Sequence, residues 1–279
     1  LSKSEQITNL LERLEELEED MEVDSNGTYP VNNQSVKNAV KPYEAFFKEY
    51  VKGYGYYDLF IVKSGTGQVV YTQAKESDNG ANLITGNLKN SGLAEVFAKV
   101  NKSKKTILVD MKPYTPSANA PAIFLGTPVY QYNKQIAVLV FQISDKSINK
   151  IMQQRAGYGD TQEDYLVGQD KLMRSDSYLD AKGHTVVASF AHPSSGRCDT
   201  VASRNALNGK KNTEIVIDYN GNPVLSAYSP IKIGENLDWA ILSEIDEAEV
   251  LIVPNSIRNS LIINTIIIFI IVIGVSFFL

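Results

Sequence analysis

The sequence contains very few residues that bind soft metals or form disulfide bonds. Its 279 residues include one cysteine, Cys198, and two histidines, His184 and His192. A single cysteine cannot close a disulfide within the chain, and zinc or iron–sulfur sites need several such ligands. We therefore expect neither a metal nor another cofactor. A lone cysteine is typically a small buried residue, and pairing between two chains is the alternative.

The motifs that mark common catalytic sites are also absent. The sequence has no GxSxG, HExxH, Walker or GxGxxG pattern, and neither Ser117 nor Cys198 has a histidine at an informative spacing. Nucleophilic catalysis needs a base held next to the nucleophile. We therefore expect that the protein is not an enzyme. A membrane-anchored surface enzyme or an adhesin is the alternative from another class.

The chain lacks an excess of positive charge. It has 27 basic and 32 acidic side chains, which gives a net charge of −5. This sign opposes binding to a phosphate backbone, so nucleic acid is not an expected partner. Nine of the acids lie within residues 1–24, where the basic residues are Lys3 and Arg13. An acidic run of this kind is typical of a solvated helix face.

The last part of the chain lacks charge altogether. Residues 261–279 include no Asp, Glu, Lys or Arg and are rich in isoleucine. At about 1.5 Å per residue this stretch is roughly 28 Å long as a helix, close to the ~30 Å of a membrane's hydrocarbon core. It is therefore predicted to be a membrane span. The preceding residues 244–258 hold four acids and one arginine, which favours a position outside the membrane.

Hydrophobic spacing divides the rest of the chain. In residues 1–52, apolar side chains recur every three or four positions, which is typical of long amphipathic helices. After Gly53, apolar runs bounded by turn residues predict strands, with one helix between the second and the third strand. The predicted strands are 58–62, 65–71, 106–109, 122–129 and 135–143, and the helix is 88–100. This order predicts an α+β fold with antiparallel sheets.

The same order of elements recurs about 100 residues later. Residues 127–143 align without a gap with residues 229–245 at an offset of 102, and Pro128 then matches Pro230. We predict two copies of one module in tandem; two unrelated α+β modules are the alternative. The predicted divisions are helices at 1–52, a first module at 53–148, a second module at 149–248, and a juxtamembrane segment with the membrane helix at 249–279.

Several segments in this order resemble the tandem Cache (double PDC) sensor region of bacterial methyl-accepting chemotaxis receptors and their histidine-kinase relatives. The segments are YYDLFIVKSGTGQVVYTQAKESDNGANL, DMKPYTPSANAPAIFLGTPVY and GDTQEDYLVGQDKLMRSDS, which begin at residues 56, 110 and 159. The resemblance extends over essentially the whole chain. It implies two PAS-like modules between an N-terminal span, absent from this sequence, and the span at 261–279.

What the resemblance implies about function is an extracytoplasmic ligand-sensing region of a transmembrane chemoreceptor. Residues 1–260 would be periplasmic, and the last helix would lie in the bacterial inner membrane. The membrane-distal module would bind a small molecule of the amino-acid, amine or organic-acid type. A homodimer would pass the signal through the membrane helix to cytoplasmic partners. The alternative is the sensor region of a histidine kinase or of a nucleotide or diguanylate cyclase.

The Arg and Trp-Tyr motif that amino-acid-binding members carry in this pocket is absent, since Trp239 is the only tryptophan. A carboxylate beside aromatic rings suits a small cationic or amine-bearing ligand, although Lys75 could equally hold a carboxylate. The predicted ligand contacts are Asp110, Tyr114, Ser117, Phe124, Tyr130, Tyr71, Lys75 and Asp78. Arg174, Asp176 and Tyr165 form a predicted secondary site, for which a structural Arg174–Asp176 clamp is the alternative.

Overall fold

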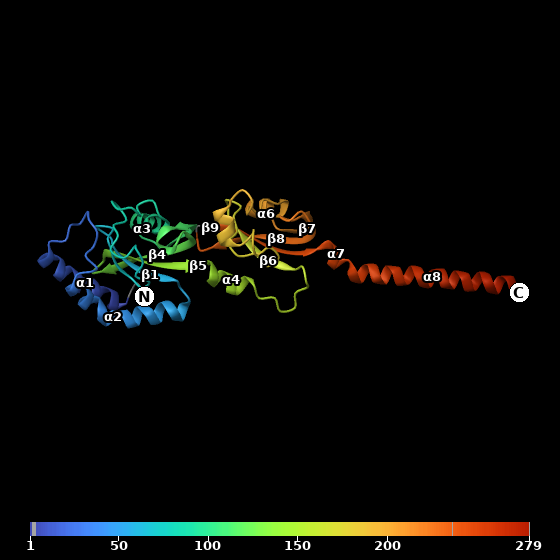
Figure 1. Cartoon of the computed structure of the whole chain (residues 1–279), viewed down its shortest axis with the longest axis horizontal. Coiled ribbons are helices and arrows are strands. Elements are labelled where there is room, and N and C mark those ends of the chain that lie inside the picture. The colour runs from blue at the N-terminus through green and yellow to red at the C-terminus, as the bar shows by residue number, and fades with distance from the viewer. Residues whose placement is uncertain (2–3, 236, 279) are drawn as a thin grey trace.

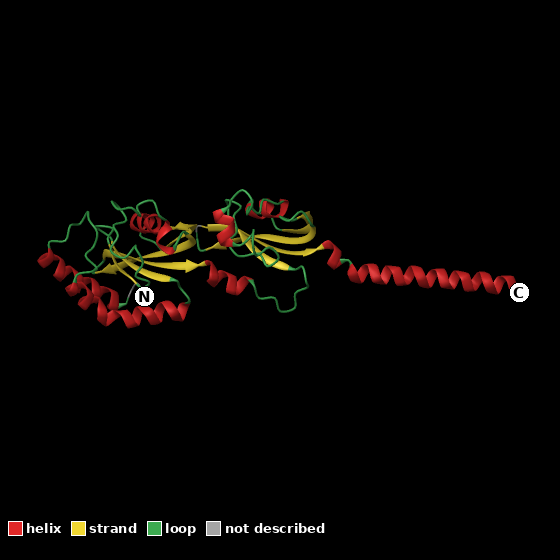
Figure 2. Ribbon diagram, in the orientation of Figure 1, coloured by secondary structure: helices red, strands yellow, loops and turns green. Residues whose placement is uncertain are grey.

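The computed structural model describes residues 1, 4–235 and 237–278 of the chain. Two antiparallel sheets follow one another along its long axis, and the last helix projects beyond the second sheet (Figure 1). Helices pack on the faces of the sheets and do not alternate with parallel strands (Figure 2). These features confirm the predicted α+β fold class.

Two amphipathic helices begin the chain, α1 (Glu5–Met21) and α2 (Gln34–Tyr54). Their N-caps are Ser4 and Asn33, whose side chains each accept a hydrogen bond from a backbone N–H of the first turn. The second helix ends at Gly55, whose φ of 73° is one that glycine adopts without strain. The apolar stripes of both helices pack together on one face of the first sheet. The packed residues include Ile7, Leu10, Leu14, Val36, Val40, Phe47, Leu59, Ile61 and Leu139.

The first sheet has the strand order β2-β1-β5-β4-β3. Its strands are β1 (Asp58–Lys63), β2 (Val69–Thr72), β3 (Ile107–Tyr114), β4 (Ala120–Gln131) and β5 (Lys134–Ser144). Helices α1 and α2 cover one face, and α3 (Gly92–Ser103) covers the other (Figure 1). Since both faces are covered, residues 59–62 form an unbroken apolar run in the sequence.

The second sheet has the strand order β6-β9-β8-β7. Its strands are β6 (Glu163–Val167), β7 (Asn212–Ile217), β8 (Pro223–Ile233) and β9 (Leu237–Asp246). Helix α4 (Asp145–Met152) leads from β5 into this part of the chain, and α5 (Val186–Ala191) and α6 (Val201–Leu207) follow β6. The core on the side of α6 contains Tyr165, Val167, Leu242 and the free thiol of Cys198.

The two sheets share one topology. The order β1-β5-β4-β3 of the first sheet recurs as β6-β9-β8-β7 in the second. The hairpin β4–β5 therefore corresponds to β8–β9, the two segments that align at the offset of 102 in the sequence. At the position of β2, the second sheet has a single bridge between Val167 and Met173.

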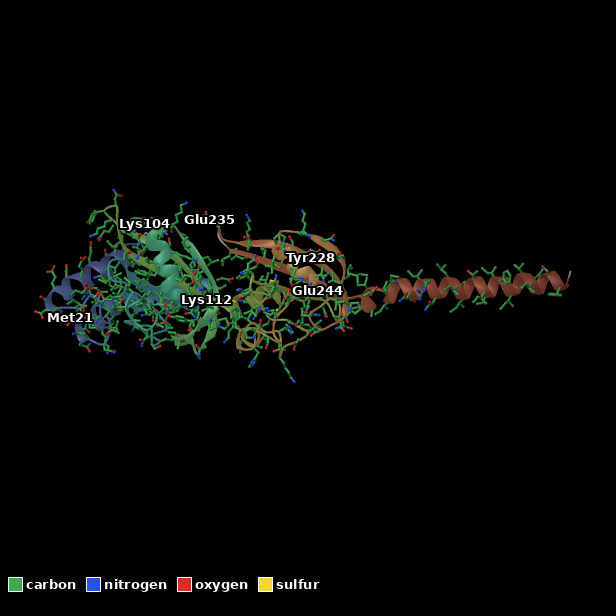
Figure 3. All side chains as sticks on the ribbon, turned by 90° about the horizontal axis from the view of Figure 1, so that it is seen from above. Met21, Lys104, Lys112, Tyr228, Glu235 and Glu244 are labelled. Atoms are coloured by element: carbon green, nitrogen blue, oxygen red, sulfur yellow. The ribbon has the colours of Figure 1, made fainter. Side chains whose placement is uncertain are left out.

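Strand β9 leads through the short helix α7 (Glu247–Val250) into α8 (Ile252–Phe278). Residues Ile252–Phe277 are long and apolar enough to cross a membrane, and none of the most apolar stretch is buried against the rest of the chain. The side chains of α8 project outward all along it, and Met21 lies at the opposite end of the molecule (Figure 3). This helix begins nine residues before the predicted apolar segment, so it includes the juxtamembrane residues.

Candidate functional site

A polar row crosses the first sheet at one end of the face that α3 covers. Asp58 on β1 is the register partner of Gln142 on β5, which is also the partner of Phe124 on β4. The side chains of Asp58 and Gln142 are buried. The next row on this face is apolar, with Phe60 opposite Val140. The polar row therefore interrupts a face that is otherwise a hydrophobic core.

The segment after β2 bonds to this row. Asp58 Oδ1 accepts hydrogen bonds from the backbone N–H groups of Gln73 and Ala74, both at 2.8 Å. Asp78, five residues after Gln73, accepts a hydrogen bond from the hydroxyl of Tyr114 through its Oδ2, at 2.8 Å. The tyrosine comes from the end of β3, so the carboxylate ties the β2 loop to the opposite edge of the sheet.

The short helix η1 (Thr115–Ser117) closes the other side of the row. The hydroxyl of Ser117 donates to Glu76 at 2.9 Å and accepts from the Nε2 of Gln142 at 3.1 Å. The hydroxyl of Tyr57 donates to the second oxygen of Glu76 at 2.5 Å. We call this group of residues the acceptor cluster. It consists of Tyr57, Asp58, Glu76, Asp78, Asn79, Tyr114, Ser117, Phe124 and Gln142.

Four buried oxygens of the acceptor cluster have no hydrogen-bond partner among the residues that the structure describes. They are Asp58 Oδ2, Asp78 Oδ1, Asn79 Oδ1 and Gln142 Oε1. All four are acceptors, and an unmet buried polar group costs about 1–3 kcal/mol. Native proteins rarely leave such groups unmet, so each one needs an explanation. Together the four oxygens mark a site with more buried acceptors than N–H or O–H donors.

Burial disfavours the ionised forms of the two aspartates of the cluster. Burial raises the pKa of Asp58 to about 7, against the opposing effect of hydrogen bonds from Ala74 and Leu59, and the charge of Asp78 adds to the rise. Burial also raises the pKa of Asp78 to about 6, although the hydrogen bond from Tyr114 lowers it. A cation close to both carboxylates would favour their ionised forms.

A cavity of about 580 Å³ lies beside the acceptor cluster. Ser77 and Asn79, on either side of Asp78, line it together with Thr115 and Pro116 of η1. The other lining residues come from 28–32, 80–82 and 86–88. Ligand cavities commonly have volumes in the range of about 300–1,000 Å³. Of the four residues with an unpartnered oxygen, Asn79 lines the cavity and Asp78 lies between two lining residues, so a small molecule has room at this edge of the cluster.

Four of the residues predicted from the sequence meet in this cluster. These are Asp78, Tyr114, Ser117 and Phe124, and the rings of Tyr114 and Phe124 pack edge to face with centroids 4.9 Å apart. Sequence reasoning missed Asp58, Gln142 and Glu76. An acid at the start of an apolar strand was the one available signal for Asp58, since a buried strand position rarely holds a charge.

Tyr71 and Lys75 lie on the opposite face of the first sheet, against α2. The ring of Tyr71 packs on Phe47 at 4.9 Å, and the Nζ of Lys75 lies 3.9 Å from the Tyr71 centroid and 3.5 Å from Glu44. The cause is a bulge: Val62 pairs with Val69 but Ile61 pairs with Tyr71. One extra residue on β2 reverses the side to which the following side chain points. The structure therefore does not bring these two residues to the cluster.

Tyr130 and Asp110 also lie elsewhere. Tyr130 is near the far end of β4 and is 45% exposed, in a depression with Lys104 and Lys105. Asp110 does not end its strand as expected, because β3 continues to Tyr114. Its side chain points away from the acceptor cluster and accepts hydrogen bonds from Arg174, which follows β6 of the second sheet.

The three residues of the predicted secondary site have three different surroundings. Arg174 bonds to Asp110 and Asp170, not to Asp176. Asp176 accepts a hydrogen bond from the N–H of Val186, and the hydroxyl of Tyr165 donates to Glu244 at 2.6 Å. The alternative of an Arg174–Asp176 clamp is therefore wrong, because the arginine pairs with Asp110 and Asp170 instead.

Solved structures show which known proteins this fold resembles. No protein-family model matches the sequence, and no curated protein matches it. The ligand-binding domain of the Pseudomonas aeruginosa PAO1 amino acid chemoreceptor PctB, solved in complex with L-Arg, is similar with a TM-score of 0.52 and 15% identity, over 76% of this chain and 80% of that one.

The extracellular domain of the putative histidine kinase vpHK1S-Z8 is similar to the same degree. Its TM-score is 0.52 at 11% identity, over 88% of this chain and 90% of that one. At such identities the likeness is one of fold. The expected resemblance to the sensor regions of chemoreceptors and histidine kinases is thereby confirmed for the fold.

Proposed function

We propose that the chain is the extracytoplasmic ligand-sensing region of a transmembrane chemoreceptor, and that the acceptor cluster binds a small protonated amine. One observation carries the choice of site: a buried group of acceptors in which four oxygens have no donor in the described part of the chain. A sensor needs a place where a ligand completes interactions that the free protein leaves open. A row of buried polar groups without hydrogen-bond partners would otherwise only destabilise the fold.

The chemistry of the cluster favours an amine. A primary ammonium group has three N–H donors and a positive charge, which suit unpartnered oxygens on Asp58, Asp78 and Gln142. The rings of Tyr114 and Phe124 lie in the same cluster, and a cation next to the face of an aromatic ring gains about 0.5–2 kcal/mol from cation–π attraction. None of the nine residues of the cluster is basic, so a ligand carboxylate would find no countercharge among them.

The architecture supports the receptor part of this proposal. The first module, 53–148 in the predicted division, lies farther from α8 than the second module at 149–248 (Figure 1). We propose that residues 1–260 are periplasmic and that α8 crosses the inner membrane. The receptor would act as a homodimer whose membrane helices pass the signal to cytoplasmic partners. PctB was solved with L-Arg, so in that protein the fold accommodates a small molecule that carries a cationic group.

A histidine kinase is the second candidate. The extracellular kinase domain matches this chain with the same TM-score as the PctB domain and over a larger part of both chains. Both candidates share the sensing task and differ in the cytoplasmic output. Fusions of the chain to the cytoplasmic part of a chemoreceptor and to that of a kinase compare the two outputs: a response to a bound amine in one fusion and not in the other favours that candidate.

Binding to the full chain in lipid nanodiscs tests the proposed site. We expect primary amines such as putrescine to bind and to raise the unfolding temperature, while organic acids of similar size do not. Asp78→Asn and Asp58→Asn should each weaken amine binding by about tenfold or more, the effect of losing a charged hydrogen bond of 1.5–3 kcal/mol. Glu95→Gln, a half-buried carboxylate on α3 that pairs with Lys99 and Lys112, is the matched control. Equal affinity in all four proteins would contradict the proposal.

A further inference from the structure

Arg174 joins the two sheets through a buried ion pair. Its Nε and Nη2 donate to the two oxygens of Asp110, both at 2.9 Å, which is the two-pronged geometry of a strong arginine–carboxylate pair. Arg174 follows β6 of the second sheet, and its side chain is only 2% exposed. Asp110 lies on β3, the edge strand of the first sheet. The pair thus joins the two halves of the molecule through a buried guanidinium and a partly buried carboxylate.

Other residues of the second sheet hold this pair in place. The indole Nε1 of Trp239, on β9, donates to Asp110 Oδ1 at 3.1 Å. Asp170 bonds to the other side of the guanidinium at 3.0 Å. At Gly168 the backbone comes so close that a Cβ would lie 2.2 Å from the guanidinium carbon. The guanidinium therefore has one defined position beside the turn that follows β6, and its partner Asp110 is also bonded to β9.

Asp110 faces these partners by strand alternation, since Leu108 lies on the same side and Val109 on the other, and a bulge in β3 changes the alternation after it. Val109 pairs with Phe124 and Lys112 with Ala122, so Asp110 and Met111 together face the single residue Ile123. The extra residue turns the strand locally. As a result Met111 stays on the side of the second sheet's core, and Tyr114 comes to the core under α3 together with Val109.

The same strand reaches the acceptor cluster. Tyr114, four residues after Asp110 on β3, donates its hydroxyl to Asp78. An amine bound to Asp78 would compete with this bond or tighten it, and either change acts on the end of β3. Being an edge strand, β3 is bonded to a neighbour on one side only, so it can move without breaking a second ladder.

We propose that the Asp110–Arg174 pair is the contact through which the acceptor cluster controls the position of the second sheet relative to the first. The proposal rests on the proposed function for its ligand. Movement of β3 would pull on Arg174 and Trp239, and β9 runs from Trp239 to α7 and the membrane helix. The route is Asp78, Tyr114, β3, Asp110 and then β9. A ligand can bias it only by binding the two arrangements with different affinity.

Hydrogen exchange of the full chain in nanodiscs, followed by mass spectrometry, tests the coupling with putrescine as the probe. In the wild type, putrescine should alter exchange in residues 163–175 and 237–250. Asp110→Asn should bind putrescine within about threefold of the wild type and lose these changes in the second sheet. Lys112→Met is the matched control, since Lys112 lies on the same strand but pairs with Glu95 of α3. It should keep them.

A second arm needs no ligand and therefore separates this inference from the proposed function. Tyr114→Phe removes the bond to Asp78, and it should alter exchange in residues 163–175 of the otherwise native chain but not in the Asp110→Asn background. An equal effect in both backgrounds, or none in either, would overturn the proposal. So would a loss of putrescine binding in Asp110→Asn alone, which would place Asp110 in the ligand site. Absence of putrescine binding in the wild type would count against the amine site only.

Discussion

Asp58 on β1 and Gln142 on β5 are direct cross-strand partners, and each keeps one buried oxygen to which no group within residues 1, 4–235 and 237–278 donates. The pair occupies positions that would extend the hydrophobic core formed by Phe60 and Val140. Apolar residues there would remove two unmet acceptors and a buried charge. Departures of this kind from consistent packing are expected at functional sites, and the hydrogen bonds that Asp58 accepts from Gln73 and Ala74 connect the pair to the segment that leads to Asn79 at the cavity wall.

The raised pKa of Asp58 predicts that the protein is more stable in mild acid. Folding raises the pKa from 3.8 to about 7, so between these values the folded state binds a proton that the unfolded state has released. The resulting stability is complete below about pH 4 and declines as the pH rises toward 7. Asp78, with a pKa of about 6, acts in the same direction. Calorimetry should give a higher unfolding temperature at pH 5 than at pH 7.5, with a smaller difference in Asp58→Asn. An identical difference in both proteins would contradict the assignment.

Amine binding should depend on pH in the opposite sense. The ligand keeps its charge over the range from pH 5 to pH 8, whereas Asp58 and Asp78 become fully ionised only toward the upper end. Affinity should therefore rise with pH and level off only at about pH 8, above the pKa of Asp58. Isothermal titration calorimetry with putrescine at several pH values measures this affinity directly. At pH 6, binding should also release protons. Tighter binding in acid would instead indicate a ligand that accepts hydrogen bonds from protonated carboxyls.

Sequence patterns predicted the periodic parts of this structure well. The long helices and most strands lie within a few residues of the predicted ranges, because two-sided burial and amphipathic stripes leave a regular signal. The strand at 106–109 was predicted too short. Pro113 argued against a strand, but β3 is an edge strand, where proline is tolerated. Asp110 was therefore placed in a loop, although it lies within a strand that carries a bulge.

The candidate site was predictable only in part because bulges decide where side chains point. Tyr114 and Asp78 were found from their place near turns, but a bulge in β2 sends Tyr71 to the other face, and a bulge in β3 brings Tyr114 to the side of α3 while Asp110 faces Arg174. A bulge has no distinct sequence pattern in either strand. Asp58 was overlooked because the residues that follow it have the pattern of a hydrophobic core. Only the pairing of β1 with β5 shows that it lies opposite Gln142.

Removing the arginine of the buried pair should destabilise the protein strongly. Arg174→Met leaves Asp110 and Asp170 without their counterion, and breaking a buried pair typically costs about 3–5 kcal/mol. Because both aspartates are partly exposed, we expect about 2–4 kcal/mol here. Arg204→Met is the matched control: its pair with Asp199 is exposed on both sides and should contribute less than about 1 kcal/mol. Unfolding followed by the fluorescence of Trp239 reports the change, and similar losses in the two variants would contradict a buried clamp.

Two glycine-to-alanine substitutions should have effects of opposite sign. At Gly168 an added Cβ would lie 2.2 Å from the Arg174 guanidinium, so the arginine has to leave its bonds with Asp110 or the backbone has to shift. At Gly53, inside α2, nothing lies within 4 Å of the added carbon, and alanine in a helix is favoured over glycine by roughly 0.5–1 kcal/mol. Thermal unfolding should therefore show Gly168→Ala well below the wild type and Gly53→Ala slightly above it. Since crowding at Gly168 acts only through Arg174, the double variant Gly168→Ala with Arg174→Met should be no less stable than Arg174→Met alone. A further loss in the double variant would mean that Gly168 serves the backbone of its turn and not the ion pair.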